Sequence, residues 1–129
     1  MNGLKNGKGK EYNKKGKLIF EGEYLYDKRD GKGKKYYDNG ILKLEGEYFN
    51  DKKDGKGKEY YDNGILKFEG NYLNDERNGK GKEYLEDGSL NMEGEFKEGY
   101  SGGKVKMYHS NGNLAFEGQM SMDDKYGKY

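Results

Sequence analysis

Apolar and polar residues alternate along most of the chain with a period of two, and the period of about 3.6 that marks a helix is absent. The run Lys17 to Leu25, KLIFEGEYL, is typical and is rich in residues that favour strands. Turn-forming dipeptides follow such runs at a regular interval. The pattern therefore predicts short antiparallel strands joined by tight turns at Asn39-Gly40, Asn63-Gly64, Asp87-Gly88 and Asn111-Gly112.

The same unit recurs every 24 residues without an insertion. A Gly-Lys pair opens each copy, at Gly7, Gly31, Gly55, Gly79, Gly103 and Gly127. A fixed period in this range is typical of arrays in which each unit buries its apolar face only against its neighbours. We therefore predict an all-β fold, an elongated single-layer array of antiparallel β-hairpins. It forms one domain over residues 1–129, in about five units at about 7–30, 31–54, 55–78, 79–102 and 103–129.

Two hairpin registers fit this pattern. A two-residue type I′ turn at Asn39-Gly40 pairs Lys34 with Glu45 and places the tyrosine of each unit on the charged face. A three-residue turn with Gly40 at a bulge instead places Tyr36 opposite Leu42, on the apolar face. Five Lys-Glu pairs favour the first register, five tyrosines favour the second, and we prefer the first. Between units, the segment Tyr26 to Asp30 is expected to be a loop.

The first register sorts the remaining side chains into two faces. Opposite charges directly across a ladder contribute roughly 0.2–1 kcal/mol per pair. The charged face holds the pairs Lys10 with Glu21, Lys34 with Glu45, Lys58 with Glu69, Lys82 with Glu93 and Lys106 with Glu117. The apolar face holds the column Phe20, Leu44, Phe68, Met92 and Phe116 and the glycines of the Glu-Gly pairs.

Composition indicates a thin fold whose balanced charge creates no long-range field to attract a charged partner. Hydrophobic residues make up 30% of the chain and the mean hydropathy is −1.40, yet 15% of residues are aromatic, 14 of them tyrosine. Because 25 basic residues balance 24 acidic ones, we expect no nucleic-acid partner. The N-terminus has no apolar run, and we see neither a signal peptide nor a transmembrane segment, so a cytoplasmic location is expected; the chain can also be a fragment.

Candidate catalytic chemistry is weak. The Gly-Lys-Gly repeats lack the Ser or Thr that follows Gly-Lys in a phosphate-binding loop. His109 is the only histidine, there is no cysteine, and neither a nucleophile nor a metal site is evident. The repeated glutamates fit a structural ladder better than an acid-base pair. We therefore expect no enzyme activity, no cofactor and no metal.

Candidate interaction residues fall into two sets. The first combines the tyrosine column with the C-terminal unit, where the repeat is least regular: Tyr12, Tyr36, Tyr60, Tyr84, Tyr108, Val105, Met107, Met120 and Met122. The second is a lysine column that could contact lipid phosphates: Lys32, Lys56, Lys80 and Lys104. Greater apolarity at the C-terminal unit fits a cap on the array better than a partner site, and open strand edges could pair with another chain.

The segment Tyr60 to Gly81, YYDNGILKFEGNYLNDERNGKG, resembles the MORN repeat, especially the variant common in bacterial, antitoxin-like repeat proteins. The resemblance extends from Gly7 to Gly127. It implies an elongated array of hairpins with an aromatic-lined groove. The unit is longer than the usual eukaryotic one and its tryptophan is missing; Tyr24, Tyr48, Tyr72 and Phe96 follow the Glu-Gly-x pattern instead.

The resemblance implies a non-catalytic module. Our leading prediction is a repeat scaffold that mediates protein-protein interaction through an aromatic-lined β-surface, with a protein partner of unknown identity. A narrower alternative is an antitoxin or immunity-like binder of one toxin protein. A third is a peripheral module for acidic phospholipids such as phosphoinositides, which would bind through the lysine column and lose affinity steeply with salt.

Overall fold

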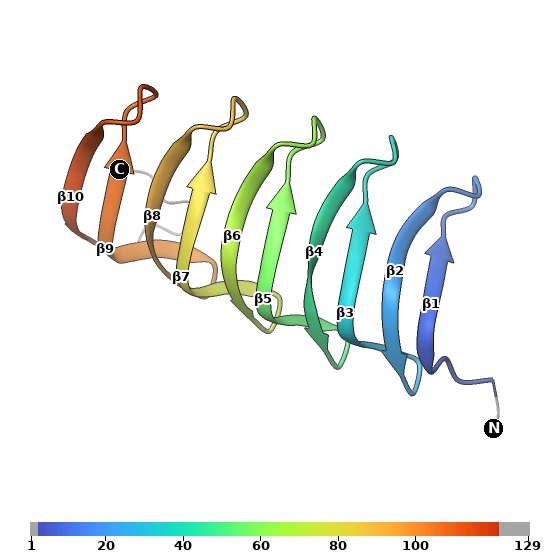
Figure 1. Cartoon of the computed structure of the whole chain (residues 1–129). Coiled ribbons are helices and arrows are strands. Elements are labelled where there is room, and N and C mark those ends of the chain that lie inside the picture. Colours follow the sequence, from blue (N-terminus) through green and yellow to red (C-terminus); the bar gives the residue numbers. More distant parts are fainter. Residues whose placement is uncertain (1–2, 122–129) are drawn as a thin grey trace.

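The computed structural model describes residues 3–121, which form ten strands in one open antiparallel sheet (Figure 1). Each strand pairs with its neighbours in chain order, so the sheet runs from β1 at one end to β10 at the other. The predicted all-β, single-layer array of hairpins is confirmed. The strands are β1 (Gly7–Tyr12), β2 (Leu18–Leu25), β3 (Lys28–Tyr36), β4 (Leu42–Phe49), β5 (Lys52–Tyr60), β6 (Leu66–Leu73), β7 (Glu76–Tyr84), β8 (Leu90–Lys97), β9 (Tyr100–Tyr108) and β10 (Leu114–Met120).

The turns at the Asn-Gly positions have three residues, so the predicted two-residue type I′ turn is wrong. The amide of Gly40 donates to the carbonyl of Tyr37 at 2.9 Å, and the amide of Tyr37 donates to the carbonyl of Ile41. Gly40 is left-handed, with φ of 86°, whereas Asn39 is not. Because only the last of the three residues needs a positive φ, the chain adopts an ordinary turn followed by a glycine bulge. These turns line one long edge of the sheet (Figure 1).

A second bulge reconciles the two predicted registers. Tyr36 lies opposite Leu42, but Lys35 lies opposite Leu44, so Lys43 is an extra residue on β4. Since this bulge shifts the ladder by one residue, the five Lys-Glu pairs align as predicted. The tyrosine column stays on the charged face as well, and the prediction that a three-residue turn would move it to the apolar face is wrong.

Type I′ turns do occur, but between the units. Tyr26 and Asp27 both have positive φ, of 48° and 73°, and β3 begins directly after them at Lys28, so the predicted loop from Tyr26 to Asp30 is mostly strand. Asn50-Asp51, Asn74-Asp75 and Glu98-Gly99 repeat the turn. Asn and Asp adopt left-handed conformations more readily than other non-glycine residues, which favours the turns at Asn50-Asp51 and Asn74-Asp75. Tyr26 and Glu98 adopt a positive φ at the first position although their residue types do not favour it.

These turns also tie each unit to the one before it. The amide of Asp51 donates to the carbonyl of Arg29, while the amide of Arg29 donates to Oδ1 of Asp51 at 2.8 Å. Asp75 makes the same two bonds with Lys53. Gly99 keeps the backbone bond to the carbonyl of Arg77 but has no carboxylate to accept a second one. The array is thus held together by turn contacts as well as by its strand ladder.

The core lies on one face of the sheet and divides into two clusters. One contains Phe20, Tyr24, Leu44 and Tyr48. The other contains Phe68, Tyr72, Met92, Phe96 and Val105. Glycines opposite glycines make room for these rings, because a Cβ on Gly33 would lie 2.6 Å from the Phe20 ring and 3.0 Å from that of Tyr48. Sheet and rings therefore pack without a second layer.

Candidate functional site

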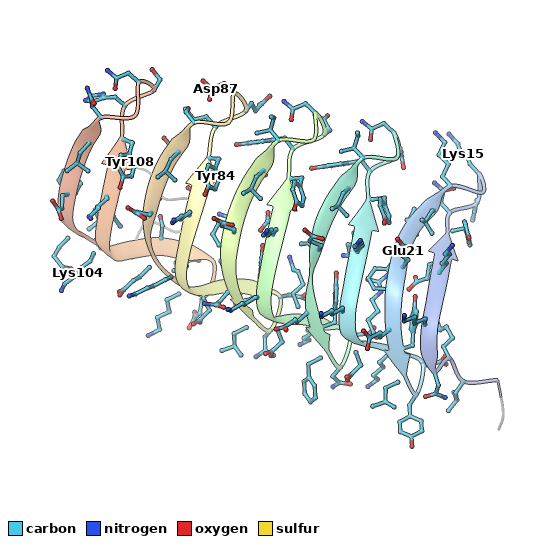
Figure 2. All side chains as sticks on the ribbon, viewed as in Figure 1. Lys15, Glu21, Tyr84, Asp87, Lys104 and Tyr108 are labelled. Carbon is cyan, nitrogen blue, oxygen red and sulfur yellow. The ribbon has the colours of Figure 1, made fainter. Side chains whose placement is uncertain are left out.

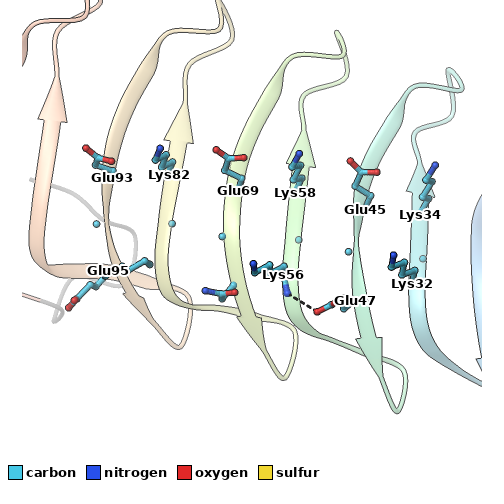
Figure 3. A pocket seen from close by; sticks show the side chains of 18 of the residues that line it. Lys32, Lys34, Glu45, Glu47, Lys56, Lys58, Glu69, Lys82, Glu93 and Glu95 are labelled. Carbon is cyan, nitrogen blue, oxygen red and sulfur yellow. Dashed lines mark hydrogen bonds between the residues drawn. The ribbon is translucent and has the colours of Figure 1, made fainter.

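A groove of about 1800 Å³ follows the charged face along the whole sheet. Every strand contributes three consecutive residues to it. The middle residue is glycine except in β9, where it is Val105, and the outer two carry polar or charged side chains. Figure 3 shows the result as two rows of side chains with the glycine backbone between them. The groove can therefore receive an elongated partner that touches backbone in the middle and charges at the sides.

The row nearer the hairpin tips (the upper row) alternates lysine with glutamate, for example Lys58 beside Glu69. Each glutamate from Glu21 to Glu93 accepts a hydrogen bond from the tyrosine fifteen residues later in the chain. The hydroxyl of Tyr36 donates to Oε1 of Glu21 at 2.5 Å, and that of Tyr84 donates to Oε1 of Glu69 at 2.9 Å. Tyr60 with Glu45 and Tyr108 with Glu93 complete the set.

The tyrosine column is therefore built into the sheet. Figure 2 shows Tyr108 nearer the hairpin tip than Lys104 of the same strand. Burial and the neighbouring carboxylate raise the pKa of Tyr36, Tyr60 and Tyr84 to about 12. Tyr12 differs, because it lies in the first strand, and it is 57% exposed. Of the five candidate tyrosines, only this one is predominantly exposed.

The other row of the groove (the lower row) carries the lysines proposed as lipid contacts. Lys32 and Lys80 lie opposite Glu47 and Glu95, whereas Lys56 lies opposite Asn71. Lys104 lies opposite Gln119. Amides replace carboxylates at two positions, so this row is more basic than the upper one. The backbone amide of Lys56 donates to Oε1 of Glu47 at 3.1 Å (Figure 3). One oxygen of this carboxylate is therefore already hydrogen-bonded within the sheet.

An exposed apolar row, which the sequence analysis did not single out, runs beside the lower row. It consists of Leu25, Phe49 and Leu73, the last residues of β2, β4 and β6. Phe49 is 64% exposed. Strand alternation places each residue on the same side as the glutamate or asparagine two positions earlier, next to the groove. The signal in the sequence is a large apolar residue recurring directly before a polar turn.

The opposite face carries aromatic rings beneath arginines. The guanidinium of Arg29 lies 4.0 Å from the centroid of the Phe20 ring, and its Nε and Nη2 donate to Glu11 at 3.1 Å each. Tyr24 donates its hydroxyl to the same carboxylate. Burial alone would raise the pKa of Glu11, but Arg29, Tyr24 and Lys5 together outweigh it and lower that pKa. The cation, carboxylate and hydroxyl thus cover the ring as one bonded group.

The arrangement recurs 48 residues later with Phe68, Arg77 and Glu59. Here Arg77 also pairs with Glu83, its Nη1 lying 2.5 Å from Oε2. The aromatic residues at the Glu-Gly-x positions, Tyr24, Tyr48, Tyr72 and Phe96, are all buried in this core. They form the packed face of the sheet and not an exposed lining.

The irregular C-terminal residues mostly contribute to packing. Val105 is buried in the second core cluster, and Met107 and Met120 are partly buried against it. Met122 lies outside the described residues. His109 belongs to the last hairpin turn, where its amide donates to the carbonyl of Asn113 at 2.8 Å. Within residues 3–121 no group of three or more His, Cys, Asp or Glu side chains could hold a metal ion.

These features define an open β-hairpin repeat protein with a grooved face and a packed face. Comparison with protein families gives matches to the MORN repeat at residues 1–17, 20–41 and 68–90. The MORN repeat variant matches at residues 53–74 and 102–121. The chain is a MORN-repeat protein, and such repeats are generally non-catalytic binding modules. No curated protein gives a significant match. None of the described residues form a helix long and apolar enough to span a bilayer.

Proposed function

We propose that the chain is a non-catalytic scaffold that binds a protein partner along the grooved face. The observation that carries the proposal is the exposed row of Leu25, Phe49 and Leu73 beside a groove of mixed charge. Large apolar side chains that stay exposed in a regular row mark interaction surfaces more often than single exposed residues do. The charges of the groove supply orientation, because alternating lysines and glutamates select a partner of matching pattern.

The test compares proteins retained by three immobilised versions of the chain. The double variant Phe49→Asp/Leu73→Asp removes two of the three residues of the apolar row. Leu85→Asp is the control, because Leu85 is an exposed leucine just beyond the end of β7. We expect a specific partner to be retained by the wild type and the control, with at least a tenfold loss in the double variant. If all retained proteins bind the double variant equally well, the proposal is wrong. Circular dichroism establishes that all three fold alike.

An antitoxin or immunity-like role is the narrower form of the same proposal. It predicts a single tight partner in a complex of fixed stoichiometry, which size-exclusion chromatography with light scattering measures. Self-association through the edge strands β1 and β10 remains a prediction, and the same measurement on the chain alone tests it.

Lipid binding is the second candidate, favoured by the excess of lysine in the lower row of the groove. Asn71 lies on β6 between the strands that carry Lys56 and Lys80. Co-sedimentation with phosphatidylcholine vesicles, with and without phosphoinositide, compares the wild type with a variant in which Lys32, Lys56 and Lys80 are changed to glutamate. Binding at physiological salt that this variant abolishes would establish the lipid role. We expect no such binding, because neighbouring glutamates and salt screen the lysines.

A further inference from the structure

The charge of the groove is not uniform along its length. In the first two hairpins, from β1 to β4, it is lined by four lysines and four glutamates. In the last three hairpins, from β5 to β10, it is lined by six lysines and only four glutamates. The difference arises because Asn71 and Gln119 stand where the other units place glutamate in the lower row. The groove therefore carries an excess of positive charge over its last three hairpins.

The lysines in this part of the lower row are open to solvent. Lys56, Lys80 and Lys104 are exposed, and so are Asn71 and Gln119. Among residues 3–121 the ion pairs involve arginine alone, so no carboxylate contacts these ammonium groups directly. Lys56 lies opposite Asn71 and Lys104 lies opposite Gln119. Two of the three lysines therefore have an amide, and not a carboxylate, as their neighbour across the ladder.

The change to Asn71 also removes a contact with the following strand. In the first two hairpins, the carboxylates of Glu23 and Glu47 accept hydrogen bonds from the backbone amides of the lower-row lysines on β3 and β5, at 3.4 and 3.1 Å. Within the described part of the chain no such bond joins the side chain of Asn71 to Lys80. A carboxylate from a ligand would therefore reach the lysines of β5 and β7 without displacing an acidic side chain between them.

The apolar row ends where this basic region begins. Its last member is Leu73 in β6, and the residue 24 positions later is Lys97, the exposed last residue of β8. Strand alternation places Lys97 on the same side of the sheet as Glu95, beside the groove. Glu76 and Glu98, at the turn edge of the same hairpin, do not line the groove. Along the array, an apolar surface is thus followed by a basic one.

We propose that the lower row from β5 to β10 binds an acidic segment of the protein partner. This inference rests on the proposed function and deepens it, because the apolar part of the same partner then lies toward β1. Equivalent residues of successive units are two strands apart, about 10 Å, so Lys56, Lys80 and Lys104 span about 20 Å. An extended chain of about six residues covers that distance. Its carboxylates neutralise lysines that the sheet leaves without one, and they fix the direction of the partner along the groove.

An acidic peptide suits this surface better than an anionic membrane does. The lysines of the lower row stand on one side of the groove, and the glutamates of the upper row stand on the other (Figure 3). A single chain that enters the groove can follow the lower row alone. A flat bilayer would cover both rows and would bring its phosphates against Glu69 and Glu93 as well.

The test follows the backbone amide NMR signals of the full chain during titration with a hexaglutamate peptide at low salt, about 50 mM, where screening is weak. We expect saturable shifts at Lys56, Lys80 and Lys104. Asn71→Glu/Gln119→Glu should weaken binding at least fivefold, because it makes the lower row as acidic in the last three hairpins as in the first two. This variant should fold normally, since the same position already holds Glu23, Glu47 and Glu95.

Asn63→Asp/Asn111→Asp is the matched control. It adds the same two negative charges at hairpin turns outside the groove, where Asp87 already stands in the fourth hairpin. It should bind hexaglutamate within about twofold of the wild type. Equal weakening in the two double variants would overturn the proposal, by showing that net charge alone matters. Unchanged binding in Asn71→Glu/Gln119→Glu would also overturn it, as would equally large shifts along β1 to β4.

Two further outcomes separate this inference from the other proposals. Suppose that phosphatidylcholine vesicles with phosphoinositide bind the wild type and not Asn71→Glu/Gln119→Glu, while hexaglutamate gives no response. The acidic-segment proposal is then wrong, and the row binds lipid. If Phe49→Asp/Leu73→Asp loses a protein partner but hexaglutamate fails to bind the wild type, the acidic segment is wrong and the scaffold role stands. Hexaglutamate binding without any effect of Phe49→Asp/Leu73→Asp on partner retention would support the basic site and contradict the role of the apolar row.

Discussion

The hydroxyl of Tyr60 donates to Oε1 of Glu45 at 2.7 Å, across the gap between one hairpin and the next. Glu45 is paired with Lys58 on the neighbouring strand, and both side chains lie on the charged face. The hydrogen bond of the carboxylate is nevertheless formed with Tyr60. Among residues 3–121 the ion pairs all involve Arg29 or Arg77. The ammonium groups of the groove lysines are therefore aligned with the glutamates without forming ion pairs with them, and they remain open to a partner.

Tyr60→Phe should destabilise the chain by about 1 kcal/mol, because it removes one hydrogen bond to a charged acceptor in a partly buried place. Tyr12→Phe, in the same column but largely exposed, should change the free energy of unfolding by less than about 0.5 kcal/mol. Urea unfolding measures both. Similar losses at the two positions would show that the Tyr-Glu bonds add no stability.

Alkaline pH should unfold the protein through its tyrosines. Burial raises the pKa of Tyr24 and Tyr48 to about 12, with the Glu11 carboxylate adding to the effect on Tyr24, and Tyr36, Tyr60 and Tyr84 behave alike. A group whose folded pKa is raised contributes stability below its unfolded pKa of 10.0, and that stability is lost as pH rises toward the folded value. Absorbance at the tyrosinate band should show these groups ionising together with the loss of the sheet signal in circular dichroism. Ionisation of these five tyrosines near pH 10.0 in a still folded chain would contradict the assignment.

Gly46→Ala should destabilise the sheet by about 3 kcal/mol. The added Cβ would lie 2.8 Å from the carbonyl oxygen of Lys56 and 2.9 Å from the Cα of Gly57, and both are backbone atoms that cannot move aside. Gly64→Ala is the control. It meets nothing within 4 Å but keeps a φ of 90°, so about 1 kcal/mol is expected from backbone strain. Equal losses by urea unfolding would show that close strand packing is not the reason for the paired glycines.

Arg77→Met should cost about 2 kcal/mol, because it leaves Glu59 and Glu83 without their cation on the packed face. Arg29→Met removes a contact with one carboxylate, Glu11, and should cost about half as much. Adding Glu59→Gln to Arg77→Met should recover part of the loss, since the unpaired charge disappears. Urea unfolding of the wild type, the two single variants and the double variant measures these differences in stability. A double variant no more stable than Arg77→Met would contradict the proposed pairing.

Acid should reduce the stability that Glu59 contributes through its contacts with Arg77 and Tyr72. Burial favours the neutral form of Glu59, but Arg77, Tyr72 and Lys53 outweigh it and lower its pKa below the ordinary value of 4.5. A carboxylate with a lowered pKa contributes stability above its unfolded pKa, and that stability is lost as pH falls through the folded value. The urea concentration at the unfolding midpoint should therefore fall when the pH is lowered below about 4, and it should fall less in Glu59→Gln than in the wild type. An identical drop in both proteins would place the acid sensitivity elsewhere.

The hairpin array and the Lys-Glu alignment could be predicted because both depend on the period of the sequence. A two-residue turn pairs Lys34 with Glu45 directly, and the observed three-residue turn gives the same pair because of the bulge at Lys43. That bulge could not be predicted, because nothing in the sequence around Lys43 marks it as an extra residue in the strand. The turn at Tyr26-Asp27 could not be predicted either, because a positive φ is expected first at glycine and neither residue is one.

The candidate site was predicted less well. The tyrosines were chosen because their column is unbroken, but that regularity reflects a bond to the preceding hairpin, as with Tyr84 and Glu69. Strand pairing gives no hint of such a contact, which joins residues on the same face of different units. Phe49 was overlooked for the opposite reason, because it stands beside a turn where an apolar residue has no packing role.

The pairing of Arg29 with Phe20, repeated by Arg77 with Phe68, bears on how such an array can lengthen. A tandem duplication of 48 residues copies one unit with the arginine and one with Lys53, so the alternation of the two kinds of unit continues. A duplication of 24 residues instead sets two units of the same kind side by side, and doubling the unit of Tyr48 would add a second copy of its buried hydroxyl, which among residues 3–121 has no hydrogen-bond partner. A pair of hairpins is therefore the unit whose duplication would keep the arginine and Lys53 units alternating, although the period of the sequence is 24 residues.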